Sequence, residues 1–143
     1  MLGPVVTCLV AGLEARRYGV RDADFEVVLG YALGLAGSVL TQAAAAVNRF
    51  YAPVVRVQKE RGHTVVDSGP YRLVRHPGNM GNLILLAATP LMLASGWAWI
   101  PAAVSIALTI VRTALEDRML RAELGGYEEY ASRVPNRLAP GLW

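Results

Sequence analysis

The sequence predicts an all-α fold: a multi-pass bundle of membrane-spanning helices with a helical C-terminal tail on the cytoplasmic side. Its 143 residues are 54% hydrophobic and only 17% charged, whereas about a quarter of the residues of a soluble domain are charged. Two stretches, residues 27–48 and 77–111, hold no charged residue. Each is long enough to cross a bilayer, which takes about 20 helical residues. The length fits a single domain, residues 1–143.

A third apolar block, Leu2 to Leu13, is short for a span. It lacks the basic start and the small-residue cleavage site of a signal peptide. We expect a partial span, an interfacial helix or the remainder of a longer N-terminal region. Cys8 lies in this block and is the single cysteine, which excludes an intramolecular disulfide and a metal site of several cysteines. We expect no bound metal.

Residues 27–48 are rich in Ala, Leu, Val and Gly and predict a transmembrane helix. Gly30, Gly34 and Gly37 recur at helical spacing, and a Gly-x-x-x-Gly pair permits a close helix contact. The alternative is that these glycines reflect only the ordinary composition of membrane helices.

Residues 77–111 are too long for one span, because a single helix would measure about 50 Å against a hydrocarbon core of about 30 Å. Pro90, Gly96 and Pro101 offer places for a break. We therefore expect a hairpin of two helices that turns near residues 95–97. Trp97 and Trp99 would then lie at the far interface, where amphipathic rings are enriched.

The charged loops predict the orientation. Residues 48–76 hold six Lys/Arg and two acids, whereas residues 14–26 hold three Arg and four acids. The positive-inside rule makes residues 48–76 cytoplasmic, and the hairpin returns the tail, residues 112–143, to the same side. The net charge of +3 then sets orientation and meets lipid headgroups. The sequence has no basic patch interleaved with aromatic residues, the pattern that would predict nucleic-acid binding.

The tail is expected to fold. Residues 112–124 have helical spacing, and Gly125-Gly126 would end that helix. Residues 127–134 predict a second short helix before Pro135.

A polar run precedes the second charge-free stretch: Gly69 to Gly81 reads Gly-Pro-Tyr-Arg-Leu-Val-Arg-His-Pro-Gly-Asn-Met-Gly. Arg112 and the pair Glu116-Asp117 follow that stretch directly. Ionisable residues at both ends of a bilayer-length apolar segment predict a polar site at a membrane surface.

These residues resemble the isoprenylcysteine carboxyl methyltransferase family, and related phospholipid methyltransferases share the Arg-His-Pro and paired-acid elements. The resemblance is carried by residues 69–77, by Arg112-x-x-x-Glu116-Asp117, by Gly126-Tyr127-x-x-Tyr130 and by Arg137-Leu138-x-Pro140, within residues 48–143. It implies an integral-membrane enzyme that uses S-adenosylmethionine in a cytoplasmic-side pocket closed by the C-terminal region. A lipid-like or prenylated substrate would enter from the membrane.

The resemblance also implies the site residues. Arg112 would be the catalytic residue, facing the methyl acceptor, and Glu116 would complete the cofactor site. The other positions that would line the cofactor are Gln58, His63, Thr64, Val65, Val66, Tyr71, His76, Pro77, Gly78 and Asn79. Asn79 stands where the family commonly has Tyr; an amide can hydrogen-bond but cannot stack as a ring does.

The family usually has more spans before the motif than one full span and one short block. We expect either a minimal member, completed by a partner in a homo-oligomer, or a truncated one.

The chemistry of single residues supports these roles and leaves simpler ones open. Glu116 could accept a charge-assisted hydrogen bond from the cofactor's amino group, or form an ordinary i,i+4 pair with Arg112. The planar fork of Arg112 suits a carboxylate, or the side chain could snorkel at a helix end. His76 could bind the cofactor's carboxylate or cap the helix that Pro77 starts.

Methyl transfer needs an in-line approach of a nucleophile, so catalysis would come from holding two reactants close and aligned. An ionised carboxylate needs no general base, whereas an amine must first lose a proton, and the sequence shows no well-placed base. Carboxylate methylation is therefore favoured. One alternative is a membrane reductase using NADPH, because sterol reductases end in a similar Arg-His-Pro hairpin, although they carry further Tyr- and Arg-rich motifs. The other is a non-catalytic small membrane protein.

Overall fold

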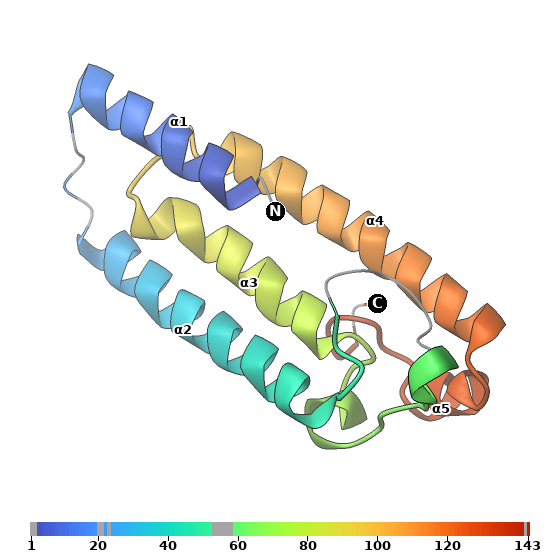
Figure 1. Ribbon diagram of the computed structural model, residues 1–143. Helices are drawn as coiled ribbons and strands as arrows, with labels where there is room; N and C mark the ends of the chain where they lie inside the picture. Colours follow the sequence, from blue (N-terminus) through green and yellow to red (C-terminus); the bar gives the residue numbers. More distant parts are fainter. Residues whose placement is uncertain (1–2, 20–21, 23, 53–58, 142) are drawn as a thin grey trace. The chain divides into compact units, whose positions relative to one another are not determined.

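The computed structural model of the chain describes residues 3–19, 22, 24–52, 59–141 and 143. Over these residues the α-helices are α1 (Gly3–Tyr18), α2 (Asp24–Val47), α3 (Pro77–Met92), α4 (Trp99–Glu123) and α5 (Tyr127–Arg133) (Figure 1). Two short 3-10 turns, η1 (Lys59–Arg61) and η2 (Gly69–Arg72), complete the regular structure of the described residues. The prediction of an all-α fold is confirmed for this part of the chain.

Two of the described helices, α2 and α4, are long and apolar enough to cross a membrane. Both present large apolar side chains outward; Phe25, Val28 and Leu35 of α2 are well exposed, as are Ile100 and Leu108 of α4. Such faces suit lipid better than water, because large exposed apolar patches are rare on soluble monomers. The number of membrane crossings remains a prediction.

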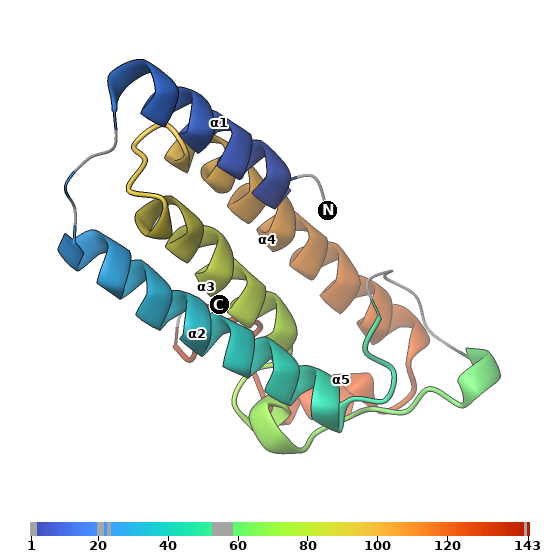
Figure 2. The same cartoon turned by 60° about the vertical axis from the view of Figure 1, so that its left-hand side comes forward.

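The chain divides into two compact units: residues 1–39 with 81–109, and residues 40–80 with 110–143. In the first unit α2 lies alongside α3 in both views (Figures 1 and 2). A Cβ built on Gly30 would lie 2.6 Å from the backbone nitrogen of Met92, and one on Gly37 would lie 2.6 Å from the carbonyl oxygen of Gly81. The predicted close helix contact is therefore confirmed, since only glycine lets the backbones approach this far.

The turn between α3 and α4 also lies in the first unit. The helices end at Met92 and begin at Trp99, which confirms the turn predicted near residues 95–97. Glu14 of α1 fastens it: its carboxylate accepts hydrogen bonds from the Ser95 hydroxyl and, at 3.0 Å, from the Trp97 backbone N–H. A side-chain carboxylate here satisfies donors that the turn would otherwise leave unpaired.

The charged segment 14–26 differs from the expected loop. α1 continues to Tyr18, and α2 already begins at Asp24. Arg16 and Arg17 fall in the last turn of α1, while Asp24 and Glu26 fall in the first turn of α2. Charges of these signs stabilise the respective helix ends, so the segment is charged and still largely helical.

A second difference concerns Arg112. The expected boundary between the apolar hairpin and the tail falls inside α4, which runs unbroken from Trp99 to Glu123. Nothing in the sequence around Arg112 stops a helix, because the nearest glycines follow Glu123. The helix ends where predicted, before Gly125 and Gly126, and Gly126 adopts the left-handed conformation with φ of 79°.

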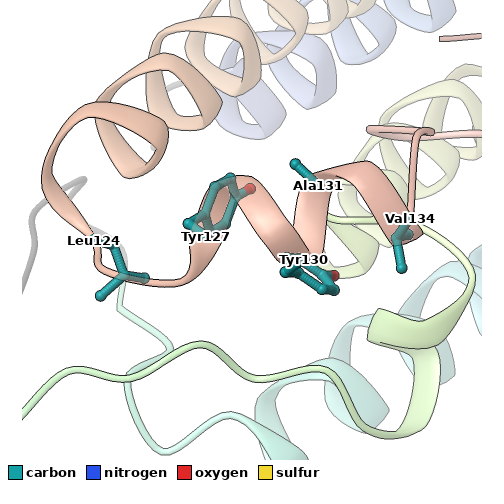
Figure 3. Close-up of a cluster of buried hydrophobic side chains, with 5 residues drawn as sticks. All are labelled: Leu124, Tyr127, Tyr130, Ala131 and Val134. Carbon is teal, nitrogen blue, oxygen red and sulfur yellow. The ribbon is translucent and has the colours of Figure 1, made fainter.

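The second unit has a small core of its own. Five buried residues form it along α5 and the turn before it: Leu124, Tyr127, Tyr130, Ala131 and Val134 (Figure 3). Val65 and Leu120 pack against this cluster. The predicted short helix before Pro135 is confirmed as α5, and its packing gives the C-terminal segment a fixed place within the second unit.

Candidate functional site

The Arg-His-Pro run lies in the second unit, between η2 and the start of α3. Pro77 is the first residue of α3, where its missing N–H costs nothing. The run is bonded to the C-terminal segment through its backbone: Arg75 N–H donates to the Asn136 carbonyl (3.0 Å) and His76 N–H to the Arg137 carbonyl (2.9 Å). Two parts of the chain that both carry the resemblance are thus held together.

A buried carboxylate, Asp117 of α4, fastens this arrangement. The guanidinium of Arg75 meets it twice, with Nε 2.7 Å from Oδ1 and Nη2 3.2 Å from Oδ2. Arg137 Nε adds a contact to Oδ2 at 2.9 Å and Arg121 Nε another at 3.3 Å. Asp117 is fully buried and Arg75 is 4% exposed, so the pair depends on this dense set of partners to offset desolvation.

His76 lies in the same network. Its Nε2 is 3.3 Å from Asp117 Oδ1 and 3.4 Å from the Tyr127 hydroxyl oxygen. The Tyr127 hydroxyl donates to Asp117 Oδ1 at 3.0 Å. Burial, together with the negative charge of Asp117, raises the pKa of Tyr127, so this phenol stays protonated and acts as a donor. The structure therefore places the His76 ring toward Asp117.

Tyr130, about one helical turn after Tyr127, also donates a hydrogen bond through its hydroxyl. Its hydroxyl donates to the backbone carbonyl of Tyr71 at 2.7 Å, and burial raises its pKa. Tyr127 and Tyr130 are both buried in the α5 cluster. Their hydroxyl bonds show that they also join α5 to the Arg-His-Pro region.

Asn79 contacts Glu116, which precedes Asp117 in α4 and projects from a different face of that helix. The Asn79 amide donates to Glu116 Oε2 at 3.2 Å and to the Thr113 hydroxyl at 3.1 Å. Thr113 is fully buried, whereas Asn79 and Glu116 are half-buried. Two residues that the resemblance assigns to one site are thus brought into direct contact. Arg112 is exposed and precedes Glu116 by about one helical turn.

Two tyrosines lie close to this contact. A Cβ built on Gly78 would lie 2.6 Å from Cε2 and 2.8 Å from the hydroxyl oxygen of Tyr51, so the ring of Tyr51 rests on the glycine. Tyr71 accepts a hydrogen bond from the Asn48 amide at 3.0 Å. Burial, and to a lesser extent the charge of Glu116, raises the pKa of Tyr71 to about 12 and raises that of Tyr51 as well.

The segment 63–66 makes different contacts. The His63 ring lies 4.3 Å from that of Phe50, centroid to centroid, and partial burial lowers the pKa of His63. Val65 packs on the α5 cluster. Val66 is half-buried and Thr64 is exposed. Gln58 lies outside the described residues.

Three residues have contacts here that the sequence did not predict: Thr113 bonds Asn79, Tyr51 packs on Gly78, and Asp117 pairs with Arg75. Asp117 was visible as half of the acid pair, but the spacing alone does not say which acid is buried. Tyr51 carries no motif signal; its place emerges only from its contact with Gly78. Among the described residues, no group of three His, Cys, Asp or Glu side chains is arranged to hold a metal ion.

The residues of this site lie in a part of the chain that is similar to known proteins. The model of the isoprenylcysteine carboxyl methyltransferase (ICMT) family matches residues 30–122. The chain is 32% identical over 128 residues to a probable protein-S-isoprenylcysteine O-methyltransferase of Oryza sativa, in both subspecies indica and japonica. It is 30% identical over 110 residues to protein-S-isoprenylcysteine O-methyltransferase B of Arabidopsis thaliana.

The matches cover most of this chain, 83% for the rice proteins and 75% for the Arabidopsis protein. The chain spans 64% of the length of the rice relatives and 56% of the Arabidopsis relative. The matched residues 30–122 include the Arg-His-Pro run, Asn79, Arg112 and the acid pair. The chain therefore belongs to the isoprenylcysteine carboxyl methyltransferase family.

Proposed function

We propose that this protein is a membrane methyltransferase that uses S-adenosylmethionine to methylate the carboxylate of a lipid-like acceptor, such as a prenylated cysteine. Family membership supports the reaction class. One observation supports the site above all others: the amide of Asn79, two residues into α3 from Pro77, bonds the carboxylate of Glu116 on α4 at 3.2 Å. A polar site on the second unit thus forms where the motif residues converge.

The residues present fit such a cofactor. S-adenosylmethionine carries an ammonium, a carboxylate and a positive sulfonium. Glu116 supplies the negative charge that a charge-assisted hydrogen bond to the ammonium needs, and Asn79 and Thr113 supply an amide and a hydroxyl beside it. Neutral tyrosines at 51 and 71 add apolar ring surface with polar ends.

When bound, the cofactor would supply an electrophilic methyl group. The protein's task is then to bind, align and exclude water. Arg112 offers a planar fork that binds a carboxylate through two parallel hydrogen bonds, and its exposed position near the proposed site suits an acceptor that enters from outside. Alignment of the two reactants supplies the main part of the rate enhancement.

The described tyrosines also favour a carboxylate over an amine as acceptor. An amine must lose a proton before it attacks, so it needs a group that accepts a proton near pH 7. A phenol of ordinary pKa, about 10, is already protonated at that pH, and burial raises the pKa of Tyr51 and Tyr71 further, so neither phenol is that base. A carboxylate acceptor is already ionised at pH 7, so it needs no group to accept a proton.

The two alternatives drawn from the sequence, a reductase using NADPH and a non-catalytic membrane protein, are not favoured. The family match and the named relatives point to methyl transfer and none of them to hydride transfer.

The chemistry of the product tests the proposal. Full-length protein in lipid nanodiscs is incubated with S-adenosylmethionine labelled on its methyl group and with a prenylated cysteine, its carboxyl amide, or a lipid amine. Label should appear only with the free carboxylate and be released as methanol by alkali, since esters hydrolyse under those conditions. Alkali-stable label on the amine, or no label with any acceptor, would reject the proposed reaction.

We also propose a multi-pass protein whose loop 49–76 and tail 112–143 both face the cytoplasm. Contacts within the second unit support a shared side: Arg133 reaches Asp67 at 3.3 Å, and the backbone of Arg75 bonds that of Asn136. With Cys8 replaced by Ala, single cysteines at Ser68 and Ser132 should be labelled from one side and a cysteine at Gly96 from the other. Opposite labelling of Ser68→Cys and Ser132→Cys would contradict the arrangement.

A further inference from the structure

We propose that Tyr51 is a cofactor-binding residue whose aromatic ring recognises the positive sulfonium of S-adenosylmethionine. The inference rests on the proposed function and adds to it a residue outside the Arg-His-Pro run and the acid pair. It is drawn from where the ring lies and from the charges around it.

The ring of Tyr51 is held against the backbone at the start of α3. A Cβ on Gly78 would lie 2.6 Å from Cε2 of Tyr51 and 3.1 Å from Cζ, so any larger residue at 78 would displace the ring. Gly78 is buried and directly precedes Asn79, whose amide bonds Glu116. Through these steps the ring lies beside the contact that carries the proposed function.

The turn that presents Tyr51 is ordered by hydrogen bonds. The backbone N–H of Tyr51 donates to the Asn48 carbonyl at 2.9 Å, and the N–H of Phe50 donates to the Asn48 side chain at 2.9 Å. The Asn48 amide also bonds the hydroxyl of Tyr71. Asn48 therefore holds the backbone of Tyr51 and the hydroxyl of Tyr71, while the contact with Gly78 places the ring of Tyr51.

The side chain of Tyr51 is partly exposed and lies near a negative charge, and both features suit a positively charged ligand. The side chain is 42% exposed although its ring packs on Gly78, so one part of it remains open to a ligand. The negative charge of Glu116 adds to burial in raising the pKa of Tyr51, while the positive charge of Arg112 opposes it. Tyr51 is therefore close enough to interact electrostatically with Glu116, which is proposed to bind the cofactor, and with Arg112, which is proposed to bind the acceptor.

A cation that has no hydrogen to donate, such as a sulfonium, can be bound by the face of an aromatic ring through a cation–π interaction. A sulfonium cannot form the hydrogen bond that an ammonium forms, so its charge is best met by a ring quadrupole or by a nearby carboxylate. The ring of Tyr51 packs on Gly78 and is still partly exposed, so it can present such a face to a ligand.

The test uses two ligands that differ in this charge. S-adenosylmethionine carries the sulfonium, whereas S-adenosylhomocysteine carries a neutral thioether of nearly the same shape. Dissociation constants for both are measured by calorimetry on the full chain in nanodiscs, for wild type, Tyr51→Leu, Tyr51→Phe and Gly78→Ala. Tyr31→Leu, at an exposed tyrosine of α2, serves as the matched control, and thermal unfolding reports whether each variant folds.

Tyr51→Leu should weaken S-adenosylmethionine about fivefold more than S-adenosylhomocysteine, the scale of a cation–π contact. Tyr51→Phe and Tyr31→Leu should leave the ratio of the two constants within about twofold of wild type. Gly78→Ala, which displaces the ring without removing it, should lose selectivity as Tyr51→Leu does and decides the matter if the latter fails to fold. Equal weakening of both ligands, or no weakening, overturns the inference; a wild type that binds neither ligand overturns the proposed function with it.

Discussion

Arg75 and Asp117 form a buried, two-point ion pair, with Nε–Oδ1 at 2.7 Å and Nη2–Oδ2 at 3.2 Å. The same guanidinium donates through Nη1 to the carbonyls of Val134 and Pro135, both at 2.7 Å. One side chain therefore joins the segment before α3, the polar stretch of α4 and the chain after α5. The first two of these elements carry His76, Arg112 and Glu116, which are proposed for the site, so the ion pair supports the site without being part of it.

Removal of the Asp117 charge should destabilise the protein strongly. Asp117→Asn leaves the charge of Arg75 buried without its carboxylate, which typically costs about 3–5 kcal/mol. Glu128→Gln is the matched control, because it breaks an exposed pair with Arg121 and should cost at most about 1 kcal/mol. Free energies of unfolding in detergent, from denaturant titration, provide the comparison. Similar losses for the two variants would show that burial of the pair contributes nothing.

The glycine contact between α2 and α3 should be sensitive to a single methyl group. A Cβ at Gly37 would lie 2.6 Å from a backbone oxygen, which cannot swing aside as a side chain can. Gly37→Ala should therefore cost about 1–3 kcal/mol through overpacking. Gly12→Ala, in α1, meets nothing within 4 Å and should be neutral or slightly stabilising, because alanine favours a helix. Equal unfolding temperatures for the two variants would contradict this packing.

Stability should fall at high pH partly because of Tyr71. Burial raises its pKa from 10.0 to about 12, so the folded state holds this proton after the unfolded state has released it. Its contribution is complete below about pH 10 and is lost as the pH rises towards 12. Tyr71→Phe should reduce the loss of unfolding free energy between about pH 9 and 12 by roughly 2 kcal/mol. If Tyr71→Phe leaves the pH profile unchanged, the phenol is not held neutral by the fold.

Arg112→Lys should separate acceptor recognition from cofactor recognition. Lysine keeps the charge but loses the planar fork that binds a carboxylate through two hydrogen bonds. Turnover of a carboxylate-bearing lipid should fall at least about tenfold, the order of one charge-assisted hydrogen bond, with cofactor affinity within about threefold of wild type. Calorimetry and methyl-transfer rates on one preparation measure both. Parallel loss of rate and affinity would assign Arg112 to the cofactor site or the fold, and loss of neither would assign it to the membrane interface.

Periodicity and composition predicted much of the fold because helices leave strong local signals. The glycine contact of α2, the turn at residues 95–97 and the end of α4 before Gly125 all follow from short-range chemistry. The extent of α1 and α4 was not predicted, since charged residues such as Arg16 or Arg112 were taken as loop or tail signals. In the structure they continue a helix, which charges do not interrupt.

The candidate site was predicted only in part, for a geometric reason. Adjacent helical residues project about 100° apart, so Glu116 and Asp117 must face different surroundings. Glu116 faces Asn79, and Asp117 faces Arg75 and Arg137. The sequence shows the pair but not which partner each acid finds, because those partners are more than 15 residues away in the chain. The contact of Tyr51 with Gly78 is equally long-range and equally invisible to local patterns.

The affinity of Glu116→Gln for S-adenosylmethionine tests the central claim most directly. The substitution keeps the size of the side chain and removes the charge proposed to meet the cofactor's ammonium. Calorimetry on the nanodisc-embedded protein should show binding weakened by about 1.5–3 kcal/mol, the value of a hydrogen bond to a charged group. Glu123→Gln, at an exposed position at the end of α4, should bind as wild type does. If Glu116→Gln binds the cofactor as tightly as Glu123→Gln, the proposed site is wrong.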